Sequence, residues 1–558
     1  MDNAQKALSI FVTCRGLNKK RGGVHMELMF IGADHEVTGS CHYIKACGKN
    51  ILVDYGMEQG VNYFENVDLP VSEAAIDYVL LTHAHIDHSG MLPRLYGRGF
   101  RGQILTTEAS ADLCSIMLRD SAHIQNQEAE WRNRKAKRSA AVDAYEVLYT
   151  MEDAMGAIDK LVPCPYDRLI NVCDGIDVKF VDVGHLLGSA AIEVFITEGN
   201  VSKKIVFSGD IGNMDQPLIK DPMLIKEADI VVTESTYGDR NHSDEKPDYV
   251  SELVRILKST FEKGGNVVIP SFAVGRTQEM LYFLRKIKQD NLLPEFKDFN
   301  VYVDSPLAVE ATGIFNKNIY SCYDEDAMEL VKKGINPITF PGLNLSITSD
   351  ESRQINFDQE PKVILSASGM CEAGRIRHHL KHNLWRAECT ILFVGYQALG
   401  TLGRAIVEGA NEVKLFGETI EVRARIETLV GMSGHADKNG LIRWIQGFEN
   451  NPAKVFVVHG EDSVCDSYVQ TLKGLGFNAY APFSGTRYDL ANERFIYEAM
   501  PVRIEHKIYT NKKANSVYER LVAAGKRLLE VIKKCEGRTN KELGKFADQI
   551  NSLCDKYE

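Results

Sequence analysis

The sequence reads Thr82-His83-Ala84-His85-Ile86-Asp87-His88-Ser89-Gly90 directly after residues 78–81, an apolar run that predicts a buried strand. The chain has 15 histidines in 558 residues, so three within six positions are more than a polar turn would carry by chance. Imidazole nitrogens and a carboxylate are donors that zinc prefers. On an extended or turning backbone, His83 and His85 can face one position while Asp87 and His88 face a second. The segment therefore predicts half of the ligands of a two-metal site.

The remaining candidate ligands are His185, Asp210 and His459. Each follows a strand-like run, at residues 178–183, 204–209 and 454–458. Each also stands beside a glycine, where the backbone can approach a small site closely. Any one of them alone would be more typical of a hydrogen-bonded strand end. Combined with the first segment, they complete two four-ligand shells in which Asp210 is a shared bridge.

This set of residues resembles the metallo-β-lactamase superfamily. Its HxHxDH signature stands here at residues 83–88, followed by His185 and Asp210, with Asp54 at an earlier strand end. The sequence is also similar to the β-CASP nucleases, whose three extra motifs stand at Glu234, His435 and His459. Three further segments are similar to the endonuclease subunit of the cleavage and polyadenylation specificity factor and its prokaryotic relatives: Ile269-Pro-Ser-Phe-Ala-Val-Gly-Arg276, Asp304-Ser-Pro-Leu-Ala308 and Ser366-Ala-Ser-Gly-Met370.

The resemblance implies an α/β fold built as a metallo-β-lactamase αββα sandwich with an inserted β-CASP domain. We expect the sandwich at residues 26–237 and 430–500 and the insertion at 238–429, with an N-terminal extension at 1–25 and a helical C-terminal extension at 501–558. Alternating strand and helix patterns in the insertion independently predict a parallel sheet flanked by helices. Ligands on both sides of the insertion must meet in space, so the substrate would bind between the two domains.

The resemblance further implies two Zn²⁺ ions per chain. His83, His85 and His185 would bind the first, Asp87, His88 and His459 the second, and Asp210 would bridge them. Asp54 would orient the attacking water or accept its proton. His435, paired with Glu234, would protonate the leaving 3′-oxygen.

Candidate substrate contacts lie in the insertion. The segment around Ser366, Ser368 and Gly369 resembles a phosphate-contact motif, and small hydroxyl residues before a helix can form an anion site. A tight structural turn is the alternative interpretation. Arg276 and Arg375 are further basic candidates for the same region.

Composition limits the classes that fit. The net charge of −11 argues against a protein that coats nucleic acid nonspecifically. The sequence contains no apolar run that would span a membrane and no signal-peptide pattern at its start. Its 12 cysteines form no regular framework, which favours reduced thiols in the cytoplasm.

The C-terminal segment is helical in period, with apolar positions such as Val517, Leu521 and Ile532. It predicts a hairpin packed on its own chain or on a second copy in a homodimer, or an arm that guides RNA.

We therefore expect a zinc-dependent ribonuclease of single-stranded RNA, acting as an endonuclease through a zinc-bridged hydroxide and leaving 5′-phosphate and 3′-hydroxyl ends. The alternatives are a 5′-to-3′ exoribonuclease, a hydrolase of a small ester or phosphodiester with the same fold, and an inactive RNA-binding scaffold. The complete ligand set argues against the scaffold.

Overall fold

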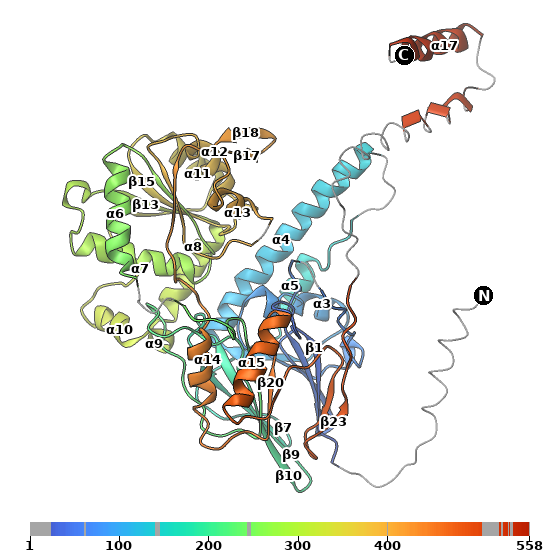
Figure 1. Cartoon of the computed structure of the whole chain (residues 1–558), viewed down its shortest axis with the longest axis vertical. Coiled ribbons are helices and arrows are strands. Elements are labelled where there is room, and N and C mark those ends of the chain that lie inside the picture. Colours follow the sequence, from blue (N-terminus) through green and yellow to red (C-terminus); the bar gives the residue numbers. More distant parts are fainter. Residues whose placement is uncertain are drawn as a thin grey trace. The chain divides into compact units, whose positions relative to one another are not determined.

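The computed structural model describes residues 24–60, 63–139, 145–242, 247–398 and 400–504, together with 524–525, 528–529, 531–533, 535 and 540–556. It divides into two units, Met1–Val502 and Arg503–Glu558 (Figure 1). Within the second unit, helix α17 spans Asn540–Asp555. The predicted N-terminal extension, apart from residues 24–25, and much of the predicted C-terminal hairpin lie outside the described residues.

Two sheets form one half of the first unit. The first has the order β23-β22-β1-β2-β3-β4-β5-β6. Its strands span Glu27–Gly32 (β1), Cys41–Ala46 (β2), Lys49–Val53 (β3), Tyr78–Leu80 (β4), Gln103–Thr107 (β5), Leu161–Cys164 (β6), Arg487–Asp489 (β22) and Arg494–Tyr497 (β23). The second has the order β21-β20-β11-β10-β9-β8-β7. Its strands span Ile170–Cys173 (β7), Ile176–Asp182 (β8), Ala190–Glu198 (β9), Val201–Phe207 (β10), Ile230–Thr233 (β11), Lys454–Val457 (β20) and Ala479–Tyr480 (β21).

The two sheets pack face to face, and helices cover their outer faces. In β10, Ile205 and Phe207 point into the core between the sheets, whereas Val206 joins the core under the helices. This alternation follows from the two-residue period of a strand. The helices on the first sheet are α2 (Ile86–Ser89), α3 (Leu92–Gly97), α4 (Glu108–Ser139) and α5 (Met151–Ile158), and the short 3-10 helix η1 (Glu73–Ala75) precedes them. The helices on the second sheet are α14 (Lys438–Ile445) and α15 (Asp462–Gly474). The predicted αββα sandwich is confirmed.

A third sheet, entirely parallel, has the order β14-β13-β15-β12-β16-β19. Its strands span Val267–Pro270 (β12), Asn300–Asp304 (β13), Leu343–Ser346 (β14), Lys362–Ser366 (β15), Thr390–Phe393 (β16) and Arg425–Thr428 (β19). In β12, Val267 and Ile269 face one helical layer and Val268 faces the other. Burial on both faces explains why these strands are continuously apolar.

Helices cover this sheet on both sides, as the alternating pattern predicts (Figure 1). On one side lie α6 (Tyr249–Phe261), α7 (Arg276–Gln289) and α8 (Pro306–Lys317), and on the other α11 (Ser349–Phe357), α12 (Ile376–Asn383) and α13 (Leu402–Val407). Shorter elements complete this part of the chain: η2 (Pro294–Phe296), α9 (Ile319–Cys322), α10 (Glu325–Lys332) and the hairpin of β17 (Glu412–Leu415) and β18 (Glu418–Glu421).

The chain leaves the sandwich after β11 and returns to it at α14, which leads into β20. These two strands are parallel neighbours, with Ile230 opposite Lys454 and Thr233 opposite Val457. Because neighbouring parallel strands end at the same edge of a sheet, the residues after β11 and after β20 stay close together. At the junction itself, the backbone N–H of Lys438 donates to the carbonyl of Arg240 over 3.0 Å, so the two ends that flank the inserted sheet lie side by side.

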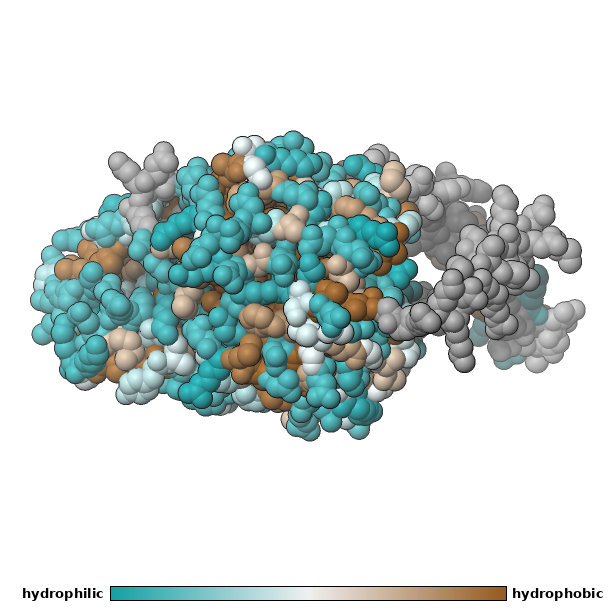
Figure 2. Space-filling view, turned by 90° about the horizontal axis from the view of Figure 1, so that it is seen from below, coloured by the Kyte–Doolittle hydropathy of each residue, from teal (hydrophilic) through white to brown (hydrophobic). Residues whose placement is uncertain are grey.

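The face of the molecule seen from below carries mostly polar side chains (Figure 2). The face in Figure 2 is largely hydrophilic, with apolar residues in small separate groups. None of the helices in the described part of the chain combines the length and the apolar character that a membrane span requires.

Phe456 should be a principal support of the sandwich. Its side chain is fully buried in β20, and its ring centroid lies 4.7 Å from that of Phe30 on the opposite sheet. Phe456→Ala should lower the free energy of unfolding by about 3–5 kcal/mol, because it leaves a cavity between the sheets. Tyr497→Ala, which removes a ring that is 56% exposed, should change stability by less than about 0.5 kcal/mol. Urea denaturation measures both, and equal effects would contradict this account of the core.

Candidate metal centre

The candidate ligands converge because they follow strand ends of both sheets. His83, His85, Asp87 and His88 come after β4, whereas Asp210, Glu234 and His459 come after β10, β11 and β20. The last three strands are parallel neighbours, so their carboxyl ends lie at one edge. His185 follows β8, and His435 follows the inserted sheet. All of these predicted residues meet at one place.

Local backbone geometry brings the two sheets together there. A Cβ added to Gly209 would lie 2.8 Å from Cβ of Thr82, so only glycine permits this approach beside Asp210. Asp54 and His459 hold φ values of 59° and 50°, which are uncommon for residues with a side chain. Such backbone persists where surrounding contacts fix it, as at functional sites.

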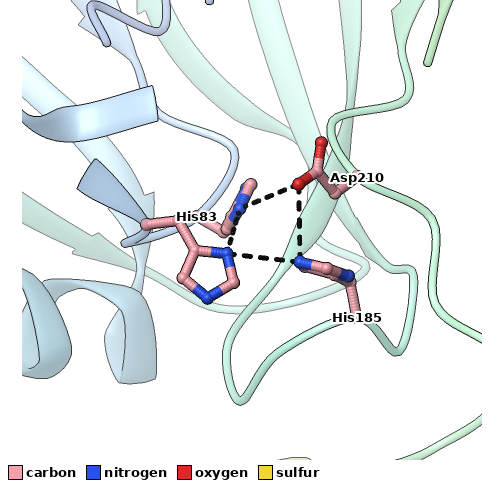
Figure 3. Close-up of side chains that lie close together, drawn as sticks. His83, His185 and Asp210 are labelled. Atoms are coloured by element: carbon pink, nitrogen blue, oxygen red, sulfur yellow. Dashed lines mark hydrogen bonds and ion pairs between the residues drawn. The ribbon is translucent and has the colours of Figure 1, made fainter. Parts of the chain in front are cut away.

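The first cluster, which we call the His83 group, contains His83, His85, His185 and Asp210 (Figure 3). His85 Nδ1 lies 3.0 Å from His83 Nε2 and 3.2 Å from His185 Nε2. Asp210 Oδ2 lies 3.4 Å from Nε2 of both His83 and His185. In a tetrahedron whose ligand bonds are about 2.0–2.1 Å long, the donor atoms are about 3.3 Å apart. The four donor atoms therefore fit one zinc ion.

The second cluster, the His459 group, contains Asp87, His88 and His459. His459 Nε2 lies 3.1 Å from His88 Nε2 and 3.6 Å from Asp87 Oδ2. Asp210 faces this group with its other oxygen, Oδ1, which lies 3.2 Å from His88 Nε2 and 3.6 Å from His459 Nε2. Among the described residues, this buried Oδ1 has no hydrogen-bond donor, as expected of an atom reserved for a cation.

A surrounding layer of acceptors fixes the histidine rings. His88 Nδ1 donates to Asp54 Oδ2 over 2.7 Å, and His185 Nδ1 donates to the carbonyl of Gly434 over 3.1 Å. Thr236 Oγ1 lies 3.2 Å from His459 Nδ1. These contacts turn the opposite nitrogen, Nε2, of each ring toward the centre.

Asp54 contacts the ligand His88 and the neighbouring Thr82. Its Oδ1 accepts the backbone N–H of Thr82 over 2.8 Å, and its Oδ2 is bound to His88. The hydroxyl of Thr82 also contacts both carboxylate oxygens, at 3.0 and 2.9 Å. In the structure this carboxylate therefore orients a ligand histidine, and its predicted role toward an attacking water stays a prediction.

The protonation of the three imidazoles in the His83 group suits metal binding. Burial, followed by the neighbouring His83, lowers the pKa of His85 to about 3, and burial also lowers the pKa values of His83 and His185. Neutral imidazole is the form that binds a metal. For His88, burial opposes protonation, but Asp210 and Asp54 outweigh it and raise its pKa.

Glu234 and His435 form a pair at the edge of the centre. His435 Nδ1 lies 3.3 Å from each carboxylate oxygen of Glu234 and 4.0 Å from Asp210 Oδ2. Burial alone would lower the pKa of His435, but the carboxylates of Glu234 and Asp210 raise it to about 9. Glu234 is held in turn by the backbone N–H of Ile211 at 2.5 Å. The imidazole is 22% exposed, and its raised pKa favours the protonated form beside the metal ligands.

Three of the predicted substrate contacts have internal partners. The Ser366 hydroxyl donates to the Asp304 carbonyl over 2.8 Å, and Arg375 Nη1 binds Asp304 Oδ1 over 2.7 Å. Arg276 pairs with Glu279 and donates to the carbonyl of Met432 over 2.5 Å. These bonds favour a structural role for the three side chains.

Ser368 and Gly369 lie in the turn that follows β15, where Ser368 is half-buried. They remain the candidates for contact with phosphate.

Three residues that contact ligand histidines, Thr82, Thr236 and Gly434, were not predicted from the sequence. Thr82 and Thr236 stand one and two residues from His83 and Glu234, so proximity in sequence could have suggested them. Their partners could not be identified in this way, because those contacts join segments far apart in the chain.

Comparison with protein families agrees with this geometry. Residues 36–112 match the metallo-beta-lactamase superfamily, residues 277–406 match the Beta-Casp domain, and residues 419–482 match the Zn-dependent metallo-hydrolase RNA specificity domain. The last segment contains both His435 and His459.

Curated relatives extend the match over most of the chain. Ribonuclease TTHA0252 of Thermus thermophilus is 35% identical over 78% of this chain and 94% of its own length. An RNase J-like protein of Methanocaldococcus jannaschii is 30% identical over 82% of this chain and 98% of its own length. Transcription termination factor FttA of the same organism is 30% identical, over 82% and 70%. The chain belongs to the β-CASP ribonuclease branch of the metallo-β-lactamase superfamily. It is a metal-dependent hydrolase.

Metal analysis of two aspartate variants tests the centre. Asp210→Ala should impair both sites, because its two oxygens face different groups. Asp54→Ala should lower the metal affinity of the His459 group alone, about 10–100-fold, because the ring of His88 loses the hydrogen bond that orients it. Elemental analysis with chelator competition measures this, and Asp77→Ala, which removes a carboxylate bound to Lys49 at the surface, is the control. Retention of both metals in Asp210→Ala would exclude the bridge.

Proposed function

We propose that this enzyme is an endoribonuclease that hydrolyses phosphodiester bonds of single-stranded RNA with two zinc ions per chain. The observation that carries the proposal is the position of Asp210, whose two oxygens face two separate ligand groups, with the Glu234–His435 pair beside it. The match to an RNA specificity domain and the ribonuclease names of two relatives support RNA as the substrate.

The donor set supports zinc at both positions. The His83 group offers three imidazole nitrogens and a carboxylate oxygen, and the His459 group two imidazole nitrogens and carboxylate oxygens from Asp87 and Asp210. Two bound zinc ions would supply Lewis acidity for the phosphoryl oxygens and a water of lowered pKa as the nucleophile. Asp54 holds His88 in the tautomer that this binding requires.

His435 is the proposed general acid. Since Nδ1 contacts Glu234, the Nε2–H of the protonated ring is the proton available to the leaving 3′-oxygen. The Glu234 carboxylate stabilises the positive charge of the ring before transfer and fixes its orientation. Proton transfer neutralises the alkoxide as the phosphorus–oxygen bond breaks.

We also propose that the enzyme works in the cytoplasm. Every cysteine in the described part of the chain is unpaired, as expected in a reducing compartment. Association of two copies through the C-terminal region is a further proposal, based on the apolar helical period of that segment.

Circular RNA tests the endonuclease proposal. The purified enzyme should cleave a circular single-stranded RNA at a rate similar to that of a linear 5′-monophosphate RNA of the same sequence, because an endonuclease needs no chain end. Gel analysis of the products measures both rates. Cleavage of linear RNA alone would identify a 5′-to-3′ exonuclease. Equal or faster cleavage of single-stranded DNA would contradict the choice of RNA.

His435→Ala tests the general acid. It should lower kcat about 10²–10⁴-fold, the usual contribution of proton transfer, while zinc content stays unchanged. Glu234→Gln should act through the same pair, so the double variant should be little worse than the worse single variant. An RNA with a 3′-phosphorothiolate linkage should partly restore the rate of His435→Ala, because sulfur leaves without a proton. If zinc is lost, or if the thiolate gives no rescue, His435 is not the acid.

A further inference from the structure

Three loops meet at the carboxyl edge of the inserted parallel sheet. They follow β12, β15 and β16, which are adjacent strands in the order β15-β12-β16. The loops carry Phe272, Gly369 and Gly395, respectively. Because the strands are parallel, these three residues leave the sheet on the same side.

The ring of Phe272 rests on the two glycines. A Cβ added to Gly369 would lie 3.3 Å from Cδ2 and Cε2 of the ring, and one added to Gly395 would lie 3.4 Å from Cε2. The amide of Gln397 donates to the carbonyls of Gly369 and Gly395 over 3.1 Å each, so it ties these two loops together. Bare backbone thus supports one side of the ring, while Phe272 remains 45% exposed.

The Phe272 loop also approaches the metal centre. Three residues further on, a Cβ added to Gly275 would lie 3.3 Å from Cδ1 of Leu186, the residue that follows the ligand His185. The next residue, Arg276, donates to the carbonyl of Met432, close to His435 in the chain. The exposed ring therefore belongs to a loop that touches both the phosphate-loop candidate Gly369 and the metal-binding loop.

We infer that Phe272 is a base-stacking residue, which holds a nucleobase of single-stranded RNA next to the phosphate that is cleaved. This inference rests on the proposed ribonuclease function. Unpaired bases stack on exposed aromatic rings, and this interaction tolerates any base because each has a π face. The internal bonds of Arg276 and Arg375 leave those two cations poorly placed to grip the strand, and the chain is acidic overall. Stacking supplies affinity that needs no positive charge.

The test combines variants of Phe272 with RNA that lacks one base. A short RNA that the wild-type enzyme cuts at one bond is prepared in a series, each member with a single abasic ribose near that bond. Phe272→Ala should raise KM about tenfold, a typical loss for one stacked base, with little change in kcat. In the wild type, one abasic position should raise KM by the same factor. In Phe272→Ala, that position should raise KM no further. Phe272→Tyr should behave like the wild type.

The control is Phe357→Ala. Phe357 is also exposed, at 68%, but it ends α11, which leads to the amino edge of the same sheet at β15. Its removal should leave KM and the abasic profile unchanged. Thermal melting checks the folding of each variant, and Phe272→Leu, which keeps apolar packing without a π face, should lose abasic sensitivity as Phe272→Ala does.

Two failures are distinguishable. If the wild type cleaves no RNA, the proposed function is wrong and the inference falls with it. The second failure is a wild type that cleaves RNA while Phe272→Ala and Phe272→Leu either keep the wild-type KM or lose activity with an unchanged abasic profile. In that case Phe272 stacks on no base, and the ribonuclease proposal stands.

Discussion

The burial of the Asp210 carboxylate constrains the side chains that surround the metal centre. The side chain is 2% exposed, and its two oxygens face different histidine clusters. An uncompensated charge in such surroundings is costly, so cations must balance it. Although burial opposes protonation of His88, Asp210 and Asp54 raise its pKa, and bound divalent ions would supply the same balance directly. The acid pair, the ligand groups and the strand ends are all arranged around this negative charge.

That arrangement tolerates a large insertion because of where the insertion begins and ends. Glu234 follows β11 and His459 follows β20, and these strands are parallel neighbours. The backbone N–H of Lys438 donates to the carbonyl of Arg240 over 3.0 Å, so the residues that flank the inserted sheet are bonded to each other. Any additional domain placed between β11 and β20 can vary in size while the two ends keep this distance. The strand pairing of the sandwich therefore does not depend on the size of the inserted sheet.

The ligands could be predicted from sequence because each is tied to a strand end, which a local pattern reveals. His83, His185 and Asp210 illustrate this, since apolar runs and glycines mark their positions. The partners of the ligands could not be predicted, because a hydrogen bond such as that of Asp54 with His88 depends on how strands pair. The sequence shows that Arg276 and Arg375 are charged, but it does not show their acceptors. Arg276 donates to the Met432 carbonyl and Arg375 to the Asp304 carboxylate. The parallel sheet of the insertion followed from periodicity, whereas the αββα layers were implied by the family resemblance.

The short return segment, residues 432–435, gives the two domains a common part. The Met432 carbonyl accepts from Arg276 of the inserted domain, the Gly434 carbonyl fixes the ring of His185, and His435 faces Glu234. A rotation of the inserted domain that pulled on Met432 would therefore alter a ligand tautomer and the position of the acid together. The enzyme is thus poorly suited to exchange of its inserted domain as an independent module: a transplanted domain would need to reproduce this anchor before the metal centre could keep its geometry.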